Sequence, residues 1–250
     1  MNEAIELLND LKFFGMKESV NYRLTEAIEK NLSHQDFLTF VLEDEHLYRK
    51  NRKSEMLRKR AKFKDKVYLE EFNPAAKRGV TKSMIQQLKT LYFVDNNENL
   101  IFVGGTGAGK TFLAQAVGHA ACMAGVETYF ITANKFFREM EAAEASGGYL
   151  TYLKRIRRSR ILILDDFGLR NYSHKEANWL LDIFEDRYQK CPVIITSQIK
   201  PQGWRTLFED EVIAEAILDR LTACAHIVEV KGDSYRSNHK VKNKLENEGN

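Results

Sequence analysis

The sequence predicts a protein of two parts, a small all-α N-terminal domain and a larger α/β domain built on a parallel sheet of five strands. Residues 1–66 contain one glycine and no proline, and their apolar residues recur at helical spacing. From residue 99 onward, short apolar runs alternate with longer helical stretches, which is typical of a parallel sheet covered by helices on both faces. We expect the helical domain at 1–66, a linker at 67–80, the α/β domain at 81–236 and a polar tail at 237–250.

The N-terminal domain is expected to hold three helices. An apolar stripe over 5–14 predicts the first helix, which Gly15 ends, and a second stripe covers 16–28. Ser33 and Asp36 form a start that resembles a capping box, with Asp in place of the commoner Glu or Gln. The third helix begins there and continues into a block of basic residues.

The α/β domain is expected to follow a break at Asn73-Pro74, with Thr81 capping a helix that ends near Leu91. Five apolar runs then have the length of buried strands, and stretches long enough for helices separate them. The expected strands are Leu100–Val103, Thr128–Ile131, Ile161–Leu164, Val193–Thr196 and Ile227–Val230.

The composition excludes several classes of protein. Apolar residues make up 44% and charged residues 29% of the chain, which argues against disorder. The acidic start lacks the basic and apolar regions of a signal peptide, and no uncharged apolar stretch is long enough to span a bilayer. Cys122, Cys191 and Cys224 lie far apart without metal-ligand spacing. We expect a cytoplasmic protein with reduced thiols and no membrane partner.

The net charge of +3 conceals an asymmetry along the chain. Residues 1–48 carry 4 basic and 10 acidic side chains, a balance of −6, whereas residues 49–66 carry 10 basic and 2 acidic side chains, a balance of +8. Such a block is typical of proteins that bind a polyanion, usually nucleic acid. The alternative is a solvated basic helix face that has no partner.

A glycine-rich segment follows the first expected strand. Residues 104–111 (GGTGAGKT) match the P-loop pattern G-x-x-x-x-G-K-[ST]. Glycines let backbone N–H groups point at phosphates, while Lys110 offsets the charge of the β- and γ-phosphates and Thr111 offers a hydroxyl to Mg²⁺. Lys110 is therefore also expected to be catalytic. The alternative, a simple glycine turn, does not require the strand before it and the helix after it. The residues expected to bind ATP are Gly104, Gly105, Thr106, Gly107, Ala108, Gly109, Lys110, Thr111 and Phe112.

The third expected strand ends in two carboxylates, Asp165 and Asp166, in the form of a Walker B strand. Ligands of doubly wound sheets bind at the carboxyl ends of the strands. Asp165 is therefore expected to hold Mg²⁺ through water, with Thr111 as the second metal residue, and Asp166 to polarise the attacking water. The alternative is an apolar strand that ends in a polar turn.

Ser197 and Gln198 follow the fourth expected strand. A polar side chain at this point can lie between the two carboxylates and the γ-phosphate and position the water, so both are candidate catalytic residues. The alternative is that they are ordinary polar residues at a strand end.

Arg220 precedes the last expected strand. An arginine there can reach the γ-phosphate of a neighbouring subunit, or it can form an ion pair with Asp219 or another acid of its own chain. Arg187 and Arg236 are weaker candidates, because such arginines are more often structural than catalytic.

These segments occur together in one known family. The chain resembles the IstB family over nearly its whole length, in the order and spacing of GGTGAGKTFLA, ILILDDFGL, DRYQKCPVIITSQ, AILDRL and SYR at 234–236. The stretch LKFFGM at 11–16 and the basic end of the third helix are similar as well. IstB proteins are ATPase helpers of insertion-sequence transposition. They are close to the DnaC and DnaI helicase loaders and belong to the AAA+ class.

The resemblance implies an AAA+ ATPase that uses ATP and Mg²⁺ to assemble on duplex DNA as a homo-oligomer. It also implies deformation of that DNA and contact with an IstA-type transposase. The sequence shows no base-reading motif of the zinc-finger or basic-zipper kind, so we expect binding that is dominated by phosphates and has weak sequence specificity. Two features depart from the AAA+ pattern. The 20 polar residues after Val230 are too few for the usual helical lid, and Asp166 stands where many members have Glu, which suggests slow hydrolysis.

Other functions are compatible with the same residues. A helicase loader would share the ATPase core and differ in its protein partner and its preference for single-stranded DNA. A small-molecule P-loop kinase would need an arginine-rich lid and an acceptor pocket. A nucleotide-gated binding module would carry the same motifs with negligible turnover.

The basic side chains expected to bind DNA phosphates form two sets. One set lies in the block at 49–66, and the other follows the second expected strand or precedes the third. The candidates are Arg52, Lys53, Lys59, Arg60, Lys135, Arg138, Lys154, Arg155, Arg157 and Arg158.

Overall fold

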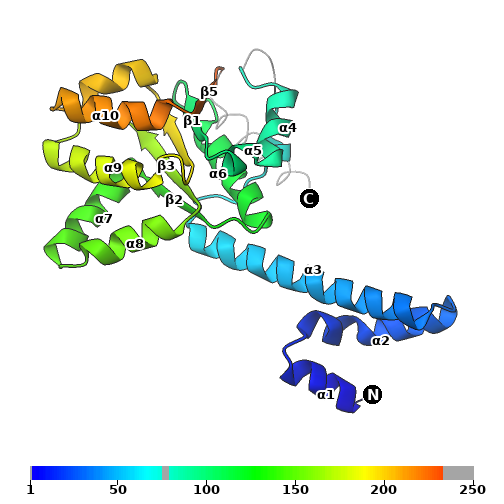
Figure 1. Ribbon diagram of the computed structural model, residues 1–250. Coiled ribbons are helices and arrows are strands. Elements are labelled where there is room, and N and C mark those ends of the chain that lie inside the picture. The colour runs from blue at the N-terminus through cyan, green and yellow to red at the C-terminus, as the bar shows by residue number, and fades with distance from the viewer. Residues whose placement is uncertain (1, 75–78, 233–250) are drawn as a thin grey trace, which may run out of the picture. The chain divides into compact units, whose positions relative to one another are not determined.

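The computed structural model describes residues 2–74 and 79–232 of the 250-residue chain (Figure 1). The chain divides into two compact units, Met1–Met56 and Leu57–Asn250, which we call the N-terminal unit and the α/β unit. Arg236 and the expected tail at 237–250 lie outside the described residues.

The N-terminal unit consists of α1 (Asn2–Asp10), α2 (Phe14–Glu29) and the first part of α3 (His34–Ala61). These are the three helices that the apolar spacing predicts. The start of α3 is capped as expected, because the Ser33 hydroxyl accepts a 3.1 Å hydrogen bond from the Asp36 amide and donates one of 2.6 Å to the Asp36 carboxylate.

Gly15 has a different position from the one expected. It lies in the first turn of α2 instead of ending α1. A Cβ atom on Gly15 would lie 2.6 Å from the Cβ of Tyr48, so glycine permits a close approach of α2 and α3. Beside it the buried Glu45 carboxylate accepts a 3.1 Å hydrogen bond from the Met16 amide. Burial by itself raises the pKa of Glu45, but hydrogen bonds from Arg49 and from the α2 amides lower it below its usual value.

The α/β unit is built on five parallel strands in the order β2-β3-β4-β1-β5. The predicted fold class and all five predicted strands are confirmed, with ends shifted by a few residues at most. The strands are β1 (Asn99–Val103), β2 (Thr128–Thr132), β3 (Ile161–Phe167), β4 (Val193–Ser197) and β5 (Ala225–Glu229).

Helices cover both faces of this sheet (Figure 1). One face packs against α6, together with Leu100 and Phe102 of β1 and Ile163 of β3. The opposite face packs against α7 to α10, together with Ile101 and Val103 of β1. The helices are α4 (Lys82–Thr90), α5 (Tyr92–Asp95), α6 (Lys110–Met123), α7 (Ala133–Ala145), α8 (Tyr149–Arg158), α9 (His174–Arg187) and α10 (Glu211–Thr222), with the short 3₁₀ helices η1 (Leu69–Glu71) and η3 (Pro201–Leu207).

The division of the chain into units differs from the boundary expected at residue 66, and the described part of the expected linker contributes side chains to the core. Residues 75–78 of that segment lie outside the described residues. The α/β unit begins at Leu57, in the last turns of α3. Ala61 is fully buried and packs with Cys122 of α6. Leu69 and Phe72 are 2% exposed and belong to the core on the α6 face. These side chains pack one by one around α6, so they carry no helical or strand periodicity that marks them as core.

Two expectations from the composition concern thiols and membranes. All three cysteines are free thiols, and burial raises the pKa of Cys122 to about 11. Within residues 2–74 and 79–232, no helix has the length and apolarity needed to cross a membrane, and no group of three or more His, Cys, Asp or Glu residues is arranged to hold a metal ion.

Candidate nucleotide site

The P-loop connects β1 to α6 at the carboxyl edge of the sheet. Gly107 and Gly109 have φ angles of 81° and 107°, and Gly109 is the left-handed residue that precedes α6. Only glycine adopts such angles without strain. At Gly104 a Cβ atom would lie 2.0 Å from the carbonyl oxygen of Val230, whereas at Gly105 it would meet nothing within 4 Å. The loop is therefore packed against the sheet at its start and open at Gly105.

Lys110 begins α6 and is only 8% exposed. Its ammonium donates 2.8 Å hydrogen bonds to the carbonyl oxygens of Gly104 and Gly105, which holds the charge within the loop. The first amides of a helix have no partner inside the helix and carry a partial positive charge. Together, the Lys110 ammonium, the first turn of α6 and the P-loop form a site for an anion such as a phosphate.

Asp165 is fully buried at the end of β3. Its Oδ1 accepts hydrogen bonds from the hydroxyls of Thr111, at 2.8 Å, and Thr196, at 2.7 Å. Its Oδ2 lies 3.2 Å from the ammonium of Lys64. Hydroxyl and carboxylate oxygens are the ligands that Mg²⁺ prefers, so the pair that the sequence suggests for the metal, Thr111 and Asp165, lies close together and fits that ion.

Asp166 follows in an unusual backbone conformation, with φ of 58°. The register of β3 against β4 shifts between Leu164 and Phe167, so the chain bulges at the two aspartates. The Asp166 amide donates a 2.9 Å hydrogen bond to the Thr196 hydroxyl. A left-handed non-glycine residue at a sheet edge is strained, and such strain is often found at functional sites.

The proposed role of Ser197 in positioning water does not fit its surroundings. Ser197 is fully buried, and its hydroxyl donates to the Phe167 carbonyl and accepts a hydrogen bond from the Trp204 indole. Both of these partners belong to the core on the face opposite α6. Gln198 is exposed just beyond the strand and stays a candidate for the water-positioning role.

Thr196, the last residue of the same expected strand, was not among the predicted catalytic residues. It is fully buried, and its hydroxyl joins Asp165 to the Asp166 amide. The alternation of side chains along β4 could have identified it. Ile194 faces α6, and Thr196, two residues later, faces the same side. On β3, Asp165 likewise follows Ile163 by two residues and faces the α6 side.

Comparison with known proteins identifies the family. Residues 6–243 match the family model described as IstB-like ATP binding protein. This chain belongs to that family. The ATP-binding protein named for insertion sequence IS21 of Pseudomonas aeruginosa is 32% identical to this IstB-like chain over 242 residues, which cover 97% of this chain and 91% of that protein.

Solved structures share the fold of this IstB-like protein. DnaA from Aquifex aeolicus bound to AMPPCP matches with a TM-score of 0.58 and 22% identity, over 74% of this chain and 56% of that one. DnaI matches with a TM-score of 0.55 and 20% identity, over 68% of this chain and 90% of that one. These neighbours share the fold of the α/β unit.

Arg220 lies away from the P-loop of its own IstB-like chain. The side-chain amide of Asn99, the first residue of β1, donates to the Arg220 carbonyl, so Arg220 lies where β1 begins and the P-loop lies where it ends. The guanidinium forms an ion pair with Glu185 of α9 and donates to the Ala216 carbonyl. An ion pair within the chain was the alternative for this residue, and its partner is Glu185 instead of Asp219.

Arg187 is a structural residue in this chain. It is 4% exposed and donates hydrogen bonds to the backbone carbonyls of Ile156, Ser159, Arg160 and Pro192. Burial lowers the pKa of the Arg187 guanidinium below its usual value. The guanidinium ties the end of α8 to the segment before β4.

The basic candidates on α7 and α8 are largely paired with acids. Arg155 pairs with Glu139 at 2.6 Å and Arg157 with Asp186. Of the remaining candidates, two lie at a longer distance from an acidic side chain and two form no ion pair with the described residues. Lys135 lies 3.9 Å from Glu139 and Arg158 lies 3.6 Å from Glu127, whereas Arg138 and Lys154 are exposed and form no ion pair with the described residues.

The candidates on α3 are divided between the two units. Arg52 and Lys53 belong to the N-terminal unit, and Lys59 and Arg60 belong to the α/β unit. All four are exposed. The Arg52 guanidinium lies 5.6 Å from the ring centre of Phe14. None of the four forms an ion pair within the part of the chain that the structure describes, so their charges are available to a polyanion.

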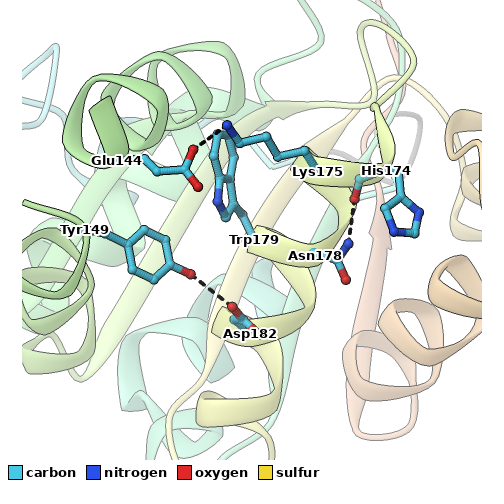
Figure 2. A pocket seen from close by; sticks show the side chains of 7 residues that line it. All are labelled: Glu144, Tyr149, His174, Lys175, Asn178, Trp179 and Asp182. Carbon is cyan, nitrogen blue, oxygen red and sulfur yellow. Dashed lines mark hydrogen bonds and ion pairs between the residues drawn. The ribbon is translucent and has the colours of Figure 1, made fainter. Parts of the chain in front are cut away.

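A pocket also lies between α7, α8 and α9 (Figure 2). Its wall includes Trp179 and two polar pairs, the hydrogen bond from Tyr149 to Asp182 and the ion pair of Lys175 with Glu144. No residue of the P-loop lines it. Its polar groups pair with each other, and it forms no part of the nucleotide site.

Proposed function

We propose that this IstB-like protein binds ATP with Mg²⁺ and hydrolyses it. The arrangement that supports this is the pair of threonine hydroxyls, from Thr111 and Thr196, on the buried carboxylate of Asp165. The P-loop backbone and Lys110 would bind the phosphates. Thr111 and Asp165 would hold Mg²⁺, which, when bound, supplies charge stabilisation for phosphoryl transfer.

For hydrolysis, Asp166 is the proposed group that polarises the attacking water, and Gln198 is the proposed group that orients it. Asp166 is held beside Asp165 by the β3 bulge and by its amide hydrogen bond to Thr196. Because its side chain is one methylene shorter than that of Glu, we expect slow turnover that depends on how the strand end is positioned.

We further propose that the protein assembles on duplex DNA as a homo-oligomer in the cytoplasm and remodels that DNA for an IstA-type transposase. Support comes from the insertion-sequence origin of the Pseudomonas aeruginosa relative and from exposed cations on α3, α7 and α8 that lack an ion pair with the described residues. Phosphate contacts of this kind bind DNA with little sequence preference.

In the proposed assembly, Arg220 acts on the nucleotide of a neighbouring subunit. Its position at the sheet edge opposite the P-loop supports an action outside its own site. The ion pair with Glu185 would have to open when the subunits associate. Arginines that act in this way contribute about 10³-fold or more to hydrolysis.

The test compares the full-length protein with two variants. Lys110→Ala should lose nucleotide binding, because the phosphate charge in the loop is no longer offset. Asp166→Asn should keep nucleotide bound and slow its hydrolysis. ATP turnover, binding of a fluorescent ATP analogue and light scattering are measured with duplex DNA, with single-stranded DNA and without DNA.

Three outcomes would contradict parts of the proposal. Unchanged nucleotide binding by Lys110→Ala would exclude the P-loop as the site. Normal hydrolysis by Asp166→Asn would assign the water to another residue. Assembly that responds only to single-stranded DNA would favour a helicase loader over a transposition helper.

A further inference from the structure

Lys64 contacts the proposed magnesium carboxylate from a part of the chain that lies before the sheet. It follows the end of α3, and 101 residues separate it from Asp165. Its ammonium lies 3.2 Å from Asp165 Oδ2, the oxygen that neither threonine contacts. It also lies 5.4 Å from the ring centre of Phe130, over the aromatic face. A cation of this chain therefore neutralises Asp165 beside its proposed metal partner Thr111.

The backbone at residues 63–65 is fixed to α6, the helix that follows the P-loop. The side-chain oxygen of Gln115 accepts hydrogen bonds from the amides of Lys64, at 2.7 Å, and Asp65, at 3.1 Å. His119 Nε2 lies 2.9 Å from the Asp65 carbonyl oxygen. The ring of Phe63 packs on α6 so closely that a Cβ atom on Gly118 would lie 2.7 Å from it. The main chain at Lys64 is thus held in place, while its side chain is about half exposed.

We propose that Lys64 is a built-in counter-cation of Asp165 that Mg²⁺ displaces when nucleotide binds. This inference rests on the proposed nucleotide function and adds a regulatory residue to the same site. Asp165 is fully buried and cannot move to another partner, whereas the Lys64 side chain is 48% exposed and can turn towards water. A buried carboxylate that loses its counter-charge is destabilised unless another positive charge replaces it, and Mg²⁺ is that replacement.

Electrostatics makes the two states exclusive. An ammonium and a divalent cation a few ångströms apart repel each other strongly where little water separates them. Lys64 therefore raises the Mg²⁺ concentration that the site requires, and it keeps the nucleotide-free site neutral and folded. The alternative for Lys64 is a direct contact with a phosphate, which would make it a contributor to nucleotide affinity instead of a competitor of the metal.

The experiment measures binding of a fluorescent ATP analogue to the full-length protein as the MgCl₂ concentration is raised. Lys64→Met removes the charge and keeps the apolar stem on Phe130. We expect the Mg²⁺ midpoint of this variant to fall by about two- to fivefold, the range over which partly exposed ion pairs change an equilibrium constant. Lys64→Arg keeps the charge, so its midpoint should stay at or above that of the wild type.

Lys66→Met is the matched control, because Lys66 is an exposed lysine of the same segment and its loss changes the net charge equally. Its midpoint should equal that of the wild type. An unchanged midpoint in Lys64→Met, or an equal fall in both Met variants, would overturn the proposal. Weaker nucleotide binding by Lys64→Met at saturating Mg²⁺ would also overturn it and assign Lys64 to a phosphate. A wild type that binds no nucleotide at any Mg²⁺ concentration would instead refute the proposed function on which this inference rests.

Discussion

The hydroxyl of Thr196 donates a 2.7 Å hydrogen bond to Asp165 and accepts one of 2.9 Å from the Asp166 amide. One buried side chain on β4 thereby fixes both aspartates at the end of β3. The arrangement depends on the parallel pairing of these two strands. It gives the proposed metal residue and the proposed water-activating residue a common support.

Replacement of Thr196 tests this support. Thr196→Val keeps the shape of the side chain but leaves the Asp166 amide without its acceptor and Asp165 without one donor. We expect a loss of about 1–3 kcal/mol in the free energy of unfolding, the cost of an unsatisfied buried polar group, together with slower ATP hydrolysis. Urea denaturation and turnover assays measure the two effects. Thr196→Ser restores the hydroxyl and should recover most of both, and a Val variant that behaves as the wild type would contradict the assigned role.

Arg220 and Glu185 provide a test of action between subunits. If Arg220 serves a neighbouring site, Arg220→Ala should abolish assembly-dependent hydrolysis, while Glu185→Gln, which breaks the same ion pair, should keep it. Mixtures of Arg220→Ala with Lys110→Ala protein should regain turnover, because each subunit supplies what the other lacks at a shared interface. Equal losses in the Arg220 and Glu185 variants, with no recovery in co-assembled mixtures, would leave Arg220 as a structural ion pair.

We expect arginines and lysines that form no ion pair within the chain to bind DNA more strongly than those that do. Lys59 and Arg60 have no ion pair with the described residues, whereas Arg155 and Arg157 are held by acids. On duplex DNA each lost phosphate contact reduces the steepness of the plot of log K against log salt by about 0.9. Joint replacement of Lys59 and Arg60 by Ala should therefore lower the slope by up to about 2. The same replacement of Arg155 and Arg157 should lower it less, and the reverse order would place the DNA on α8.

His119 predicts an acid sensitivity of the α/β unit. It is 4% exposed, and burial lowers the pKa of its imidazole below the usual value of 6.5. At a pH between the lowered pKa of the folded protein and 6.5, the unfolded chain binds a proton at His119 that the folded chain excludes. The free energy of unfolding therefore falls as the pH drops below about 6.5. His119→Phe removes the titrating group and keeps an aromatic ring beside Phe63. Urea denaturation from pH 8 to 5 should show a smaller decline for this variant, and an identical decline would assign the sensitivity to other groups.

The fold class, the five strands and the position of the P-loop are predictable from the amino-acid sequence. These features follow from short-range rules, because alternation, glycine spacing and strand length are written in consecutive residues. The pair Asp165 and Thr111 was also predictable. A P-loop fixes one partner, and the carboxyl end of a buried strand identifies the other.

The side chains that surround Asp165 and the charges that remain free become known from the packing of the folded chain. Thr196 rather than Ser197 contacts the aspartates because the side-chain alternation of β4 turns Thr196 towards α6 and Ser197 towards Trp204. Lys64 reaches Asp165 across 101 residues, and Arg155 and Arg157 find acids on α7 and α9. The contacts of Lys64, Arg155 and Arg157 depend on the packing of elements far apart in the chain, and no local pattern encodes them.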